Sequence, residues 1–230
     1  MMLDSSPYDG ELFRRLRQAC AEEWRAYVGH PFVRRMGDGT LAEDGFRHYL
    51  AQDYLFLIHF ARAYALAIYK ADNLADMRSA ADTVKALLDV EMGLHLEYCA
   101  GWGISEQDIL AEPEAMATMA YTRFVLERGM AGDVLDLYVA LAPCVVGYGE
   151  IGLALQRDPA TLKEGNLYLP WIEMYAGAEY QEVAAAAVAQ LDRLAQSRLT
   201  PQREAALIKT FAQATRLEAG FWQMGLSLSP

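Results

Sequence analysis

Apolar residues recur every three or four positions along almost the whole chain, which is the spacing of one face of an α-helix. Alternating strand patterns are largely missing, and the Asp-Gly pairs sit beside helical patterns where they close no hairpin. The expected fold class is therefore all-α, a helical bundle forming a single domain over residues 1–230. The helices are expected at about residues 9–29, 42–71, 74–101, 113–128, 131–156, 168–197 and 201–226.

Local signals mark some of these boundaries. Thr200 can cap the last helix, and Pro201 suits its first turn because a proline there gives up no helical hydrogen bond. The segment from Asp158 to Asn166 has the composition of an exposed loop. The chain shows no internal repeat and no long linker, in keeping with one domain.

The composition excludes several classes of protein. Hydrophobic residues make up 53% of the 230 positions and charged residues 22%, which is typical of a folded chain with a large core. With 31 acidic and 20 basic residues the net charge is -11, so neither nucleic acid nor an anionic membrane surface is an expected partner. The longest charge-free apolar run, Leu137–Gly149, is short for a membrane span and contains a proline and two glycines.

Three cysteines, Cys20, Cys99 and Cys144, stand at wide and irregular spacing. An odd number at such spacing is not a disulfide framework. The first eleven residues include three acidic ones and no apolar core of a secretory signal. These features predict a soluble protein of the reducing cytoplasm.

Asp53 stands on a helical face where a core residue is expected. A buried carboxylate is costly unless it is paired or hydrogen-bonded. Asp53 therefore either joins two helices through a hydrogen bond to a Tyr or a backbone N–H, or holds a ligand in a closed pocket. The residues that share its face are all aromatic or aliphatic: Phe46, Tyr49, Leu50, Phe56, Leu57 and Phe60.

Glu218 has a similar setting in the last predicted helix. Such a carboxyl group should have a raised pKa and could exchange protons near neutral pH. The alternative is a buried ion pair with an Arg or Lys. Its face-mates include Phe211, Ala214, Thr215, Phe221 and Trp222.

Cys144 also lies on an apolar face, where a buried thiol is usually an inert small hydrophobe. Two neighbouring features make its helix unusual. Pro143 should kink the helix and free a carbonyl near Val139, and the glycines that follow allow close backbone approach. Those glycines are Gly147, Gly149 and Gly152, and Tyr148 stands one turn beyond the thiol.

These three polar residues suggest one chemistry. A thiol needs help to become a thiolate, and a carboxylate of raised pKa can take its proton and later protonate a leaving group. A second carboxylate can hold a polar ring. Cys144, Glu218 and Asp53 therefore form a candidate set for covalent displacement.

Six sequence blocks, in order along the chain, resemble segments of the thiaminase II (TenA) family. Together they extend over about residues 20–224. The blocks are His30–Val33 followed by Gly37–Leu41, then Gln52–Tyr54, Glu91–His95, Leu141–Cys144 with Tyr148 and Glu150, Trp171–Ile172 with Tyr175 and Gly177, and Glu218 with Phe221–Trp222.

The resemblance implies a haem-oxygenase-like helical fold, a homotetramer, and cleavage or salvage of thiamin-derived aminopyrimidines without a metal or cofactor. It makes Cys144 the nucleophile that attacks the pyrimidine ring, Glu218 the general acid and base, and Asp53 the anchor for the ring nitrogen and exocyclic amine. Tyr121, Tyr148 and Tyr175 become pocket tyrosines that position the ring. Phe56 falls where some members carry a Tyr, so it can stack on the ring but offers no hydroxyl.

The sequence leaves three other functions open. Glu91 and His95, at i and i+4, could begin a di-iron site, but the chain has only four histidines and no second Glu–His pair at that spacing, which favours a structural hydrogen bond. A haem protein would need an early proximal His, and His30 instead suits a His-Pro turn. A non-catalytic regulator of the same fold would have no need for Cys144, Glu218 and Asp53 together.

Overall fold

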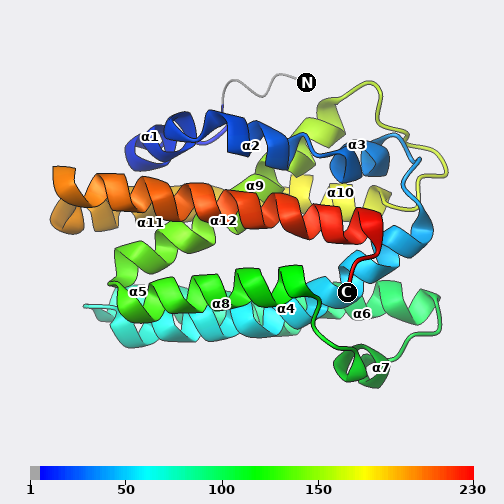
Figure 1. Cartoon of the computed structure of the whole chain (residues 1–230), viewed down its shortest axis with the longest axis horizontal. Helices are drawn as coiled ribbons and strands as arrows, with labels where there is room; N and C mark the ends of the chain where they lie inside the picture. Colours follow the sequence, from blue (N-terminus) through cyan, green and yellow to red (C-terminus); the bar gives the residue numbers. More distant parts are fainter. Residues whose placement is uncertain (1–5) are drawn as a thin grey trace. The chain divides into compact units, whose positions relative to one another are not determined.

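The structure, a computed structural model, describes residues 6–230, and its regular elements over that range are all helical (Figure 1). The all-α expectation is thereby confirmed. The helices are α1 (Glu11–Ala19), α2 (Ala21–Val28), α3 (Pro31–Gly37), α4 (Glu43–Lys70), α5 (Leu74–Ala86), the π-helical turn η1 (Leu87–Glu91), α6 (Met92–Gly101), α7 (Glu106–Ala111), α8 (Met116–Ala131), α9 (Val134–Arg157), α10 (Leu169–Ala176), α11 (Ala178–Arg198) and α12 (Pro201–Ser227).

The helices group into two compact units. The first comprises the described residues up to Leu41 together with Tyr138–Trp222, and the second comprises Ala42–Leu137 with Gln223–Pro230. The first unit thus contains α1 to α3, α10, α11 and most of α9 and α12, whereas α4 to α8 belong to the second. The expectation of one domain over residues 1–230 stays a prediction.

Two of the long predicted helices are interrupted, and a third contains an irregular turn. The segment 9–29 breaks at Cys20, whose φ of -127° and ψ of 42° lie outside the helical region, and the segment 168–197 breaks at the extended Gly177. The segment 74–101 is continuous but passes through the π-helical turn η1. Because the apolar spacing continues on both sides of each interruption, it gives no sign that the backbone changes.

Two short helices, α3 and α7, were not predicted, although each begins with a recognisable cap. His30 precedes α3 and its Nδ1 accepts a hydrogen bond from the Phe32 N–H, with Pro31 in the first turn. Ser105 and Asp108 form a reciprocal capping box at the start of α7. With seven and six residues these helices are too short to display a helical period.

Other local predictions are confirmed. The Thr200 hydroxyl accepts a hydrogen bond from the Arg203 N–H at the start of α12. The segment after α9 is a mostly exposed loop. Asn166 anchors it, because its side-chain amide donates to the carbonyls of Met36 and Gly37. The loop therefore has a fixed connection to the end of α3.

Helix α9 is a long and strongly apolar helix. By length and composition alone it could cross a membrane, but 83% of its most apolar window is buried within the protein. A helix that is hydrophobic all round and covered by other helices is typical of a protein core. Its glycines permit that coverage: a side chain at Gly147 would collide with the Tyr27 ring, and one at Gly152 with the backbone of Tyr175 and Ala176.

In the second unit, α4 is the central element. It is 28 residues long, and α5 and α8 run along it (Figure 1). Sixteen of its residues are buried, from Gly45 to Ala67, and they include Asp53 and the neighbouring Gln52. A polar pair on so buried a helix must find partners on the elements packed against it.

We predict that Gly152→Ala destabilises the protein by about 2 kcal/mol, because the new Cβ would lie 2.5 Å from the Tyr175 carbonyl carbon and rigid backbone cannot move aside cheaply. Denaturant unfolding measures the loss. The matched control is Gly220→Ala in α12, where nothing lies within 4 Å of the added atom. There the higher helix propensity of alanine should leave stability unchanged or raise it by up to about 1 kcal/mol. Equal losses in the two variants would refute the packing argument.

Candidate functional site

The seven candidate residues are all buried, with no more than 8% of any side chain exposed, and they fall into two sets. In the first unit, Cys144 and Tyr148 belong to α9, Tyr175 to α10 and Glu218 to α12. In the second unit, Asp53 and Phe56 belong to α4 and Tyr121 to α8.

Asp53 makes two hydrogen bonds with neighbouring side chains. The Tyr49 hydroxyl donates to its Oδ2 at 3.1 Å from one turn earlier in α4, and His95 Nε2 lies 2.7 Å from the same oxygen. Neither bond uses Oδ1. The expected bond to a tyrosine is thus present, together with a helix-to-helix contact from α4 to α6.

His95 is fixed at both ring nitrogens. Its Nδ1 lies 2.8 Å from the main-chain carbonyl oxygen of Glu91, the last residue of η1. Burial by itself would lower the pKa of the imidazole, but the hydrogen bond and charge of Asp53, aided by the charge of Glu91, outweigh it and raise the pKa above its usual value. The pair of Asp53 and His95 therefore favours a protonated ring.

The hydrogen bond expected between Glu91 and His95 exists, but it uses the backbone carbonyl and not the carboxylate. The contact between His95 and Asp53 was not foreseen. A signal was present, because Met92 and Cys99, at i-3 and i+4, place His95 on the buried face of its helix. A buried imidazole needs polar partners, and Asp53 was the buried carboxylate still lacking one.

Phe56 and Tyr121 form the aromatic part of this set. Their ring centroids are 5.1 Å apart with the planes tilted by 35°, and Phe60 stacks on Phe56 at 5.2 Å. Phe56 lies one helical turn from Asp53 along α4. The combination of a carboxylate and an aromatic wall suits a flat polar ring that offers hydrogen-bond donors.

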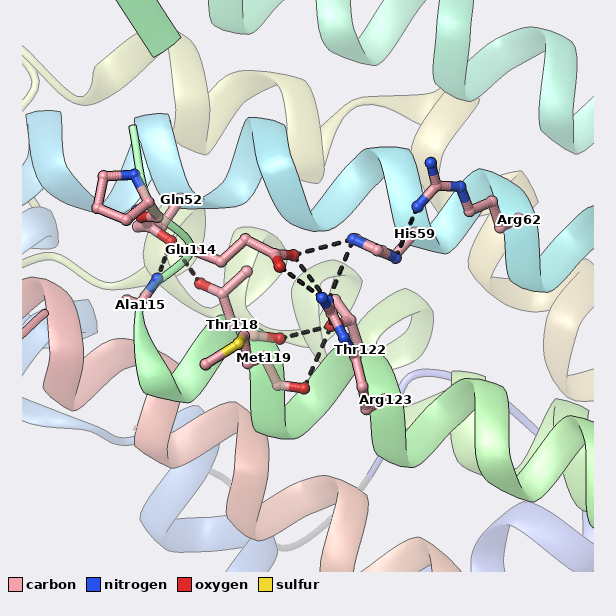
Figure 2. A network of polar contacts seen from close by, with 10 residues as sticks. Gln52, His59, Arg62, Glu114, Ala115, Thr118, Met119, Thr122 and Arg123 are labelled. Atoms are coloured by element: carbon pink, nitrogen blue, oxygen red, sulfur yellow. Dashed lines mark hydrogen bonds and ion pairs between the residues drawn. The ribbon is translucent and has the colours of Figure 1, made fainter. Parts of the chain in front are cut away.

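Gln52 fixes the start of α8 beside this set. Its amide donates to the Pro113 carbonyl, and its oxygen accepts from the Ala115 N–H at 2.8 Å and the Thr118 hydroxyl at 2.7 Å (Figure 2). These three bonds use the side-chain oxygen twice and one of the two amide N–H groups. The adjacent Glu114 then forms an ion pair with Arg123.

In the first unit, the surroundings of Cys144 are shaped by Pro143 and Gly147. Helix α9 continues through Pro143, and the Tyr27 hydroxyl donates to the Pro143 carbonyl at 3.2 Å. The missing side chain at Gly147 makes room for that tyrosine ring. A hydroxyl group from α2 thus approaches the helix backbone next to the thiol.

The other two cysteines are poor nucleophiles. Burial raises the pKa of the Cys20 thiol to about 12, and Cys20 Sγ donates to the Leu16 carbonyl. Burial likewise raises the pKa of Cys99 to about 11. Both thiols would be almost wholly protonated at neutral pH, and a thiol in that form does not attack.

Aromatic rings connect the helices of the first set. Tyr148, one turn beyond Cys144, contacts Tyr175 at 5.0 Å and Trp222 at 5.2 Å between ring centroids. Trp222 is itself one turn beyond Glu218 in α12. The two rings in contact, Tyr148 and Trp222, therefore each lie one helical turn beyond a candidate catalytic residue.

Residues proposed as metal or haem ligands have other partners. His95 contacts Asp53 and the Glu91 carbonyl, and His30 caps α3. Within residues 6–230, no group of three or more His, Cys, Asp or Glu side chains is arranged to hold a metal ion.

Comparison with known protein families and sequences gives two findings. The model of the TENA/THI-4/PQQC family matches residues 17–228. The aminopyrimidine aminohydrolase of Halalkalibacterium halodurans is 38% identical over 201 residues, which cover 87% of this chain and 89% of that protein.

Solved structures agree on the fold. The crystal structure of a TenA family transcription regulator from Silicibacter sp. TM1040 is similar with a TM-score of 0.90 and 46% identity, covering 96% of this chain and 98% of that one. A domain with a haem-oxygenase-like fold from Shewanella denitrificans has a TM-score of 0.70 at 16% identity, covering 97% and 94% of the two chains. The haem-oxygenase-like fold expected from the sequence is confirmed.

We predict that Gln52→Met destabilises the protein by about 3 kcal/mol. Methionine fills a similar volume but leaves the Pro113 carbonyl and the Ala115 N–H buried without partners, at about 1–3 kcal/mol each. Thermal and urea unfolding report the loss.

The control for this variant is Glu114→Gln, which weakens the neighbouring ion pair to Arg123. Both of its side chains are partly exposed, so the change should cost about 1 kcal/mol or less. A Gln52→Met variant as stable as the control would show that Gln52 does not hold the start of α8.

Proposed function

Because this chain belongs to the TENA/THI-4/PQQC family, we propose that it is an enzyme hydrolysing thiamin or thiamin-derived aminopyrimidines, with a role in thiamin salvage. The observation that carries the proposal is the presence of Cys144, Glu218 and Asp53 as buried polar residues in a chain similar over 87% of its length to an aminopyrimidine aminohydrolase. The reaction proposed converts aminomethyl pyrimidine to hydroxymethyl pyrimidine.

The proposed chemistry is a covalent displacement. Glu218 takes the proton of the Cys144 thiol, and the thiolate forms a C–S bond to the pyrimidine ring, which loses its aromaticity. Glu218 returns a proton to the amine leaving group as its C–N bond breaks. Water, deprotonated by the same carboxylate, then forms the C–O bond, and departure of the thiolate restores the aromatic ring. Neither a metal nor a cofactor enters these steps.

Asp53 is proposed to anchor the ring nitrogen and the exocyclic amine, for which its unused Oδ1 is a suitable acceptor. Tyr121, Tyr148 and Tyr175 are proposed to position the ring. Phe56, already in contact with Tyr121, would stack on the pyrimidine face without adding a hydrogen bond. The absence of a hydroxyl at this position makes it a candidate determinant of substrate preference.

We also propose that the enzyme is cytoplasmic and assembles as a homotetramer. All three cysteines are free, in keeping with a reducing compartment. Apolar side chains are exposed along α5 and η1, where Leu74, Met77 and Leu88 are 57%, 38% and 50% accessible. Exposed apolar stripes of this kind suit association with further copies of the chain.

If the chain assembles as a homotetramer, light scattering should give about four times the 25.6 kDa mass of one chain. Replacing Leu74 and Leu88 with Glu should lower the mass if this stripe is an interface. A monomeric wild-type protein would contradict the proposal.

A non-catalytic regulator is the second candidate, because the similar Silicibacter protein is described as a TenA family transcription regulator. Two features count against it here. A net charge of -11 does not suit DNA, and a regulator has no need for a nucleophile, an acid and an anchoring carboxylate.

Steady-state kinetics with thiamin and with aminomethyl aminopyrimidine test the function and identify the better substrate. We predict that Cys144→Ser lowers kcat by at least about three orders of magnitude on whichever substrate is used, since the C–S intermediate can no longer form. Cys20→Ser and Cys99→Ser should keep nearly full activity because their protonated thiols take no part.

Two results would count against this proposal. Absence of turnover on both substrates by the wild-type protein would reject the enzymatic function and favour the regulator. Turnover that survives in Cys144→Ser would keep the function but reject the covalent mechanism.

A further inference from the structure

We propose that His95 is a positioning residue that holds the proton shared with Asp53, so that Asp53 meets its substrate as a carboxylate. The inference deepens the proposed function, since the substrate held by Asp53 is the aminopyrimidine of that proposal. Its geometric basis is the set of contacts of His95 with Glu91 and Asp53 and of Tyr49 with Asp53.

The main-chain carbonyl of Glu91 determines the position of one ring proton of His95. A main-chain carbonyl oxygen only accepts hydrogen bonds, so His95 Nδ1, 2.8 Å away, must carry a proton. A neutral imidazole has a single N–H, and here that N–H is already assigned to Nδ1. The tautomer with its only proton on Nε2 is therefore excluded by the backbone.

A second proton then lies between His95 Nε2 and Asp53 Oδ2, which are 2.7 Å apart. Either Asp53 is a neutral acid that donates to a neutral imidazole, or a carboxylate accepts from an imidazolium. The Tyr49 hydroxyl donates to the same Oδ2, and a donated hydrogen bond stabilises a negative charge on that oxygen. We therefore assign the proton to His95 and the negative charge to Asp53.

The charged groups around the pair support this assignment. From α4 the ring faces Asp53, with Tyr49 behind it, and from η1 it faces Glu91. Both carboxylates favour a cationic ring, and they raise the pKa of His95 although burial opposes them. Without the imidazolium, a carboxylate only 3% exposed would lack a counter-charge, which is costly in a buried site.

The functional consequence concerns Oδ1, the second carboxylate oxygen of Asp53. Tyr49 and His95 both bind Oδ2, so a substrate amine can be met by Oδ1. A carboxylate oxygen accepts from an amine N–H, whereas the hydroxyl of a neutral acid would compete as a donor. The π-helical turn η1 ends at Glu91, whose carbonyl orients the ring, so this irregular turn contributes to the same arrangement.

Neutron diffraction from crystals of the deuterated wild-type protein at neutral pH tests the assignment without any variant. We expect deuterons on both Nδ1 and Nε2 of His95 and none on Asp53 Oδ2. In Asp53→Asn, which loses the carboxylate charge that outweighs burial, only Nδ1 should carry a deuteron. A wild-type His95 with an unprotonated Nε2 would overturn the proposal.

The pH dependence of kcat/KM tests its role. His95→Gln keeps a neutral donor near Asp53 but removes the charge. We expect KM to rise roughly ten- to hundredfold near neutral pH, with the acidic limb of the profile displaced to higher pH. The matched control is His48→Gln in α4, whose ring Nε2 lies 3.0 Å from the Ser229 carbonyl oxygen and where the profile should not change.

The outcomes separate this inference from the function on which it rests. If the His95→Gln variant keeps the wild-type KM and the acidic limb of its profile stays in place, His95 is only a packing residue and the proposal fails. If the wild-type protein turns over neither substrate, the proposed function fails, while the neutron result still decides where the proton lies.

Discussion

A carboxylate inside an apolar helix must be matched by donors or by a positive charge, and α4 satisfies this condition at Asp53. Tyr49 supplies a hydroxyl from the preceding turn, and His95 supplies an imidazole from another helix. That imidazole is itself held by the carbonyl at the end of a π-helical turn. Helix α4, the turn η1 and helix α6 are thus joined by one chain of polar contacts, and the neighbouring Gln52 extends the arrangement to the start of α8.

The first unit solves a different problem, the close packing of an almost entirely apolar helix. Helix α9 has three glycines within six residues, and the groups that fill the space they leave include a tyrosine ring and the backbone of α10. A hydroxyl group consequently reaches the Pro143 carbonyl beside Cys144. The thiol stands next to the residue whose carbonyl the Tyr27 hydroxyl reaches, whereas burial keeps the other two thiols protonated.

The candidate residues have different proposed roles. Cys144 and Glu218 would make and break bonds, whereas Asp53 and the rings near it offer a carboxylate and an aromatic wall suited to a flat, donor-rich ligand. The rival metal-site interpretation of Glu91 and His95 depended on their helical spacing. In the structure the imidazole is hydrogen-bonded to Asp53 and to the Glu91 backbone carbonyl, so both of its ring nitrogens have partners other than a metal.

How much of this was predictable from sequence depended on the range of each interaction. The helical period identified the all-α fold and the buried positions of Asp53, Glu218 and Cys144, because residues three and four apart share a face whatever the rest of the chain does. It could not show the breaks at Cys20 and Gly177, where the apolar spacing continues, nor α3 and α7, which are shorter than two turns of usable pattern.

Helical periodicity could not identify the long-range partner of Asp53. His95 lies 42 residues away, and only the packing of α6 against α4 places its Nε2 at 2.7 Å from the carboxylate. By itself, the sequence determined that a carboxylate would be buried and would need a partner. The tertiary structure decided which residue that partner is, because hydrogen bonds require a distance and an angle that helix packing alone supplies.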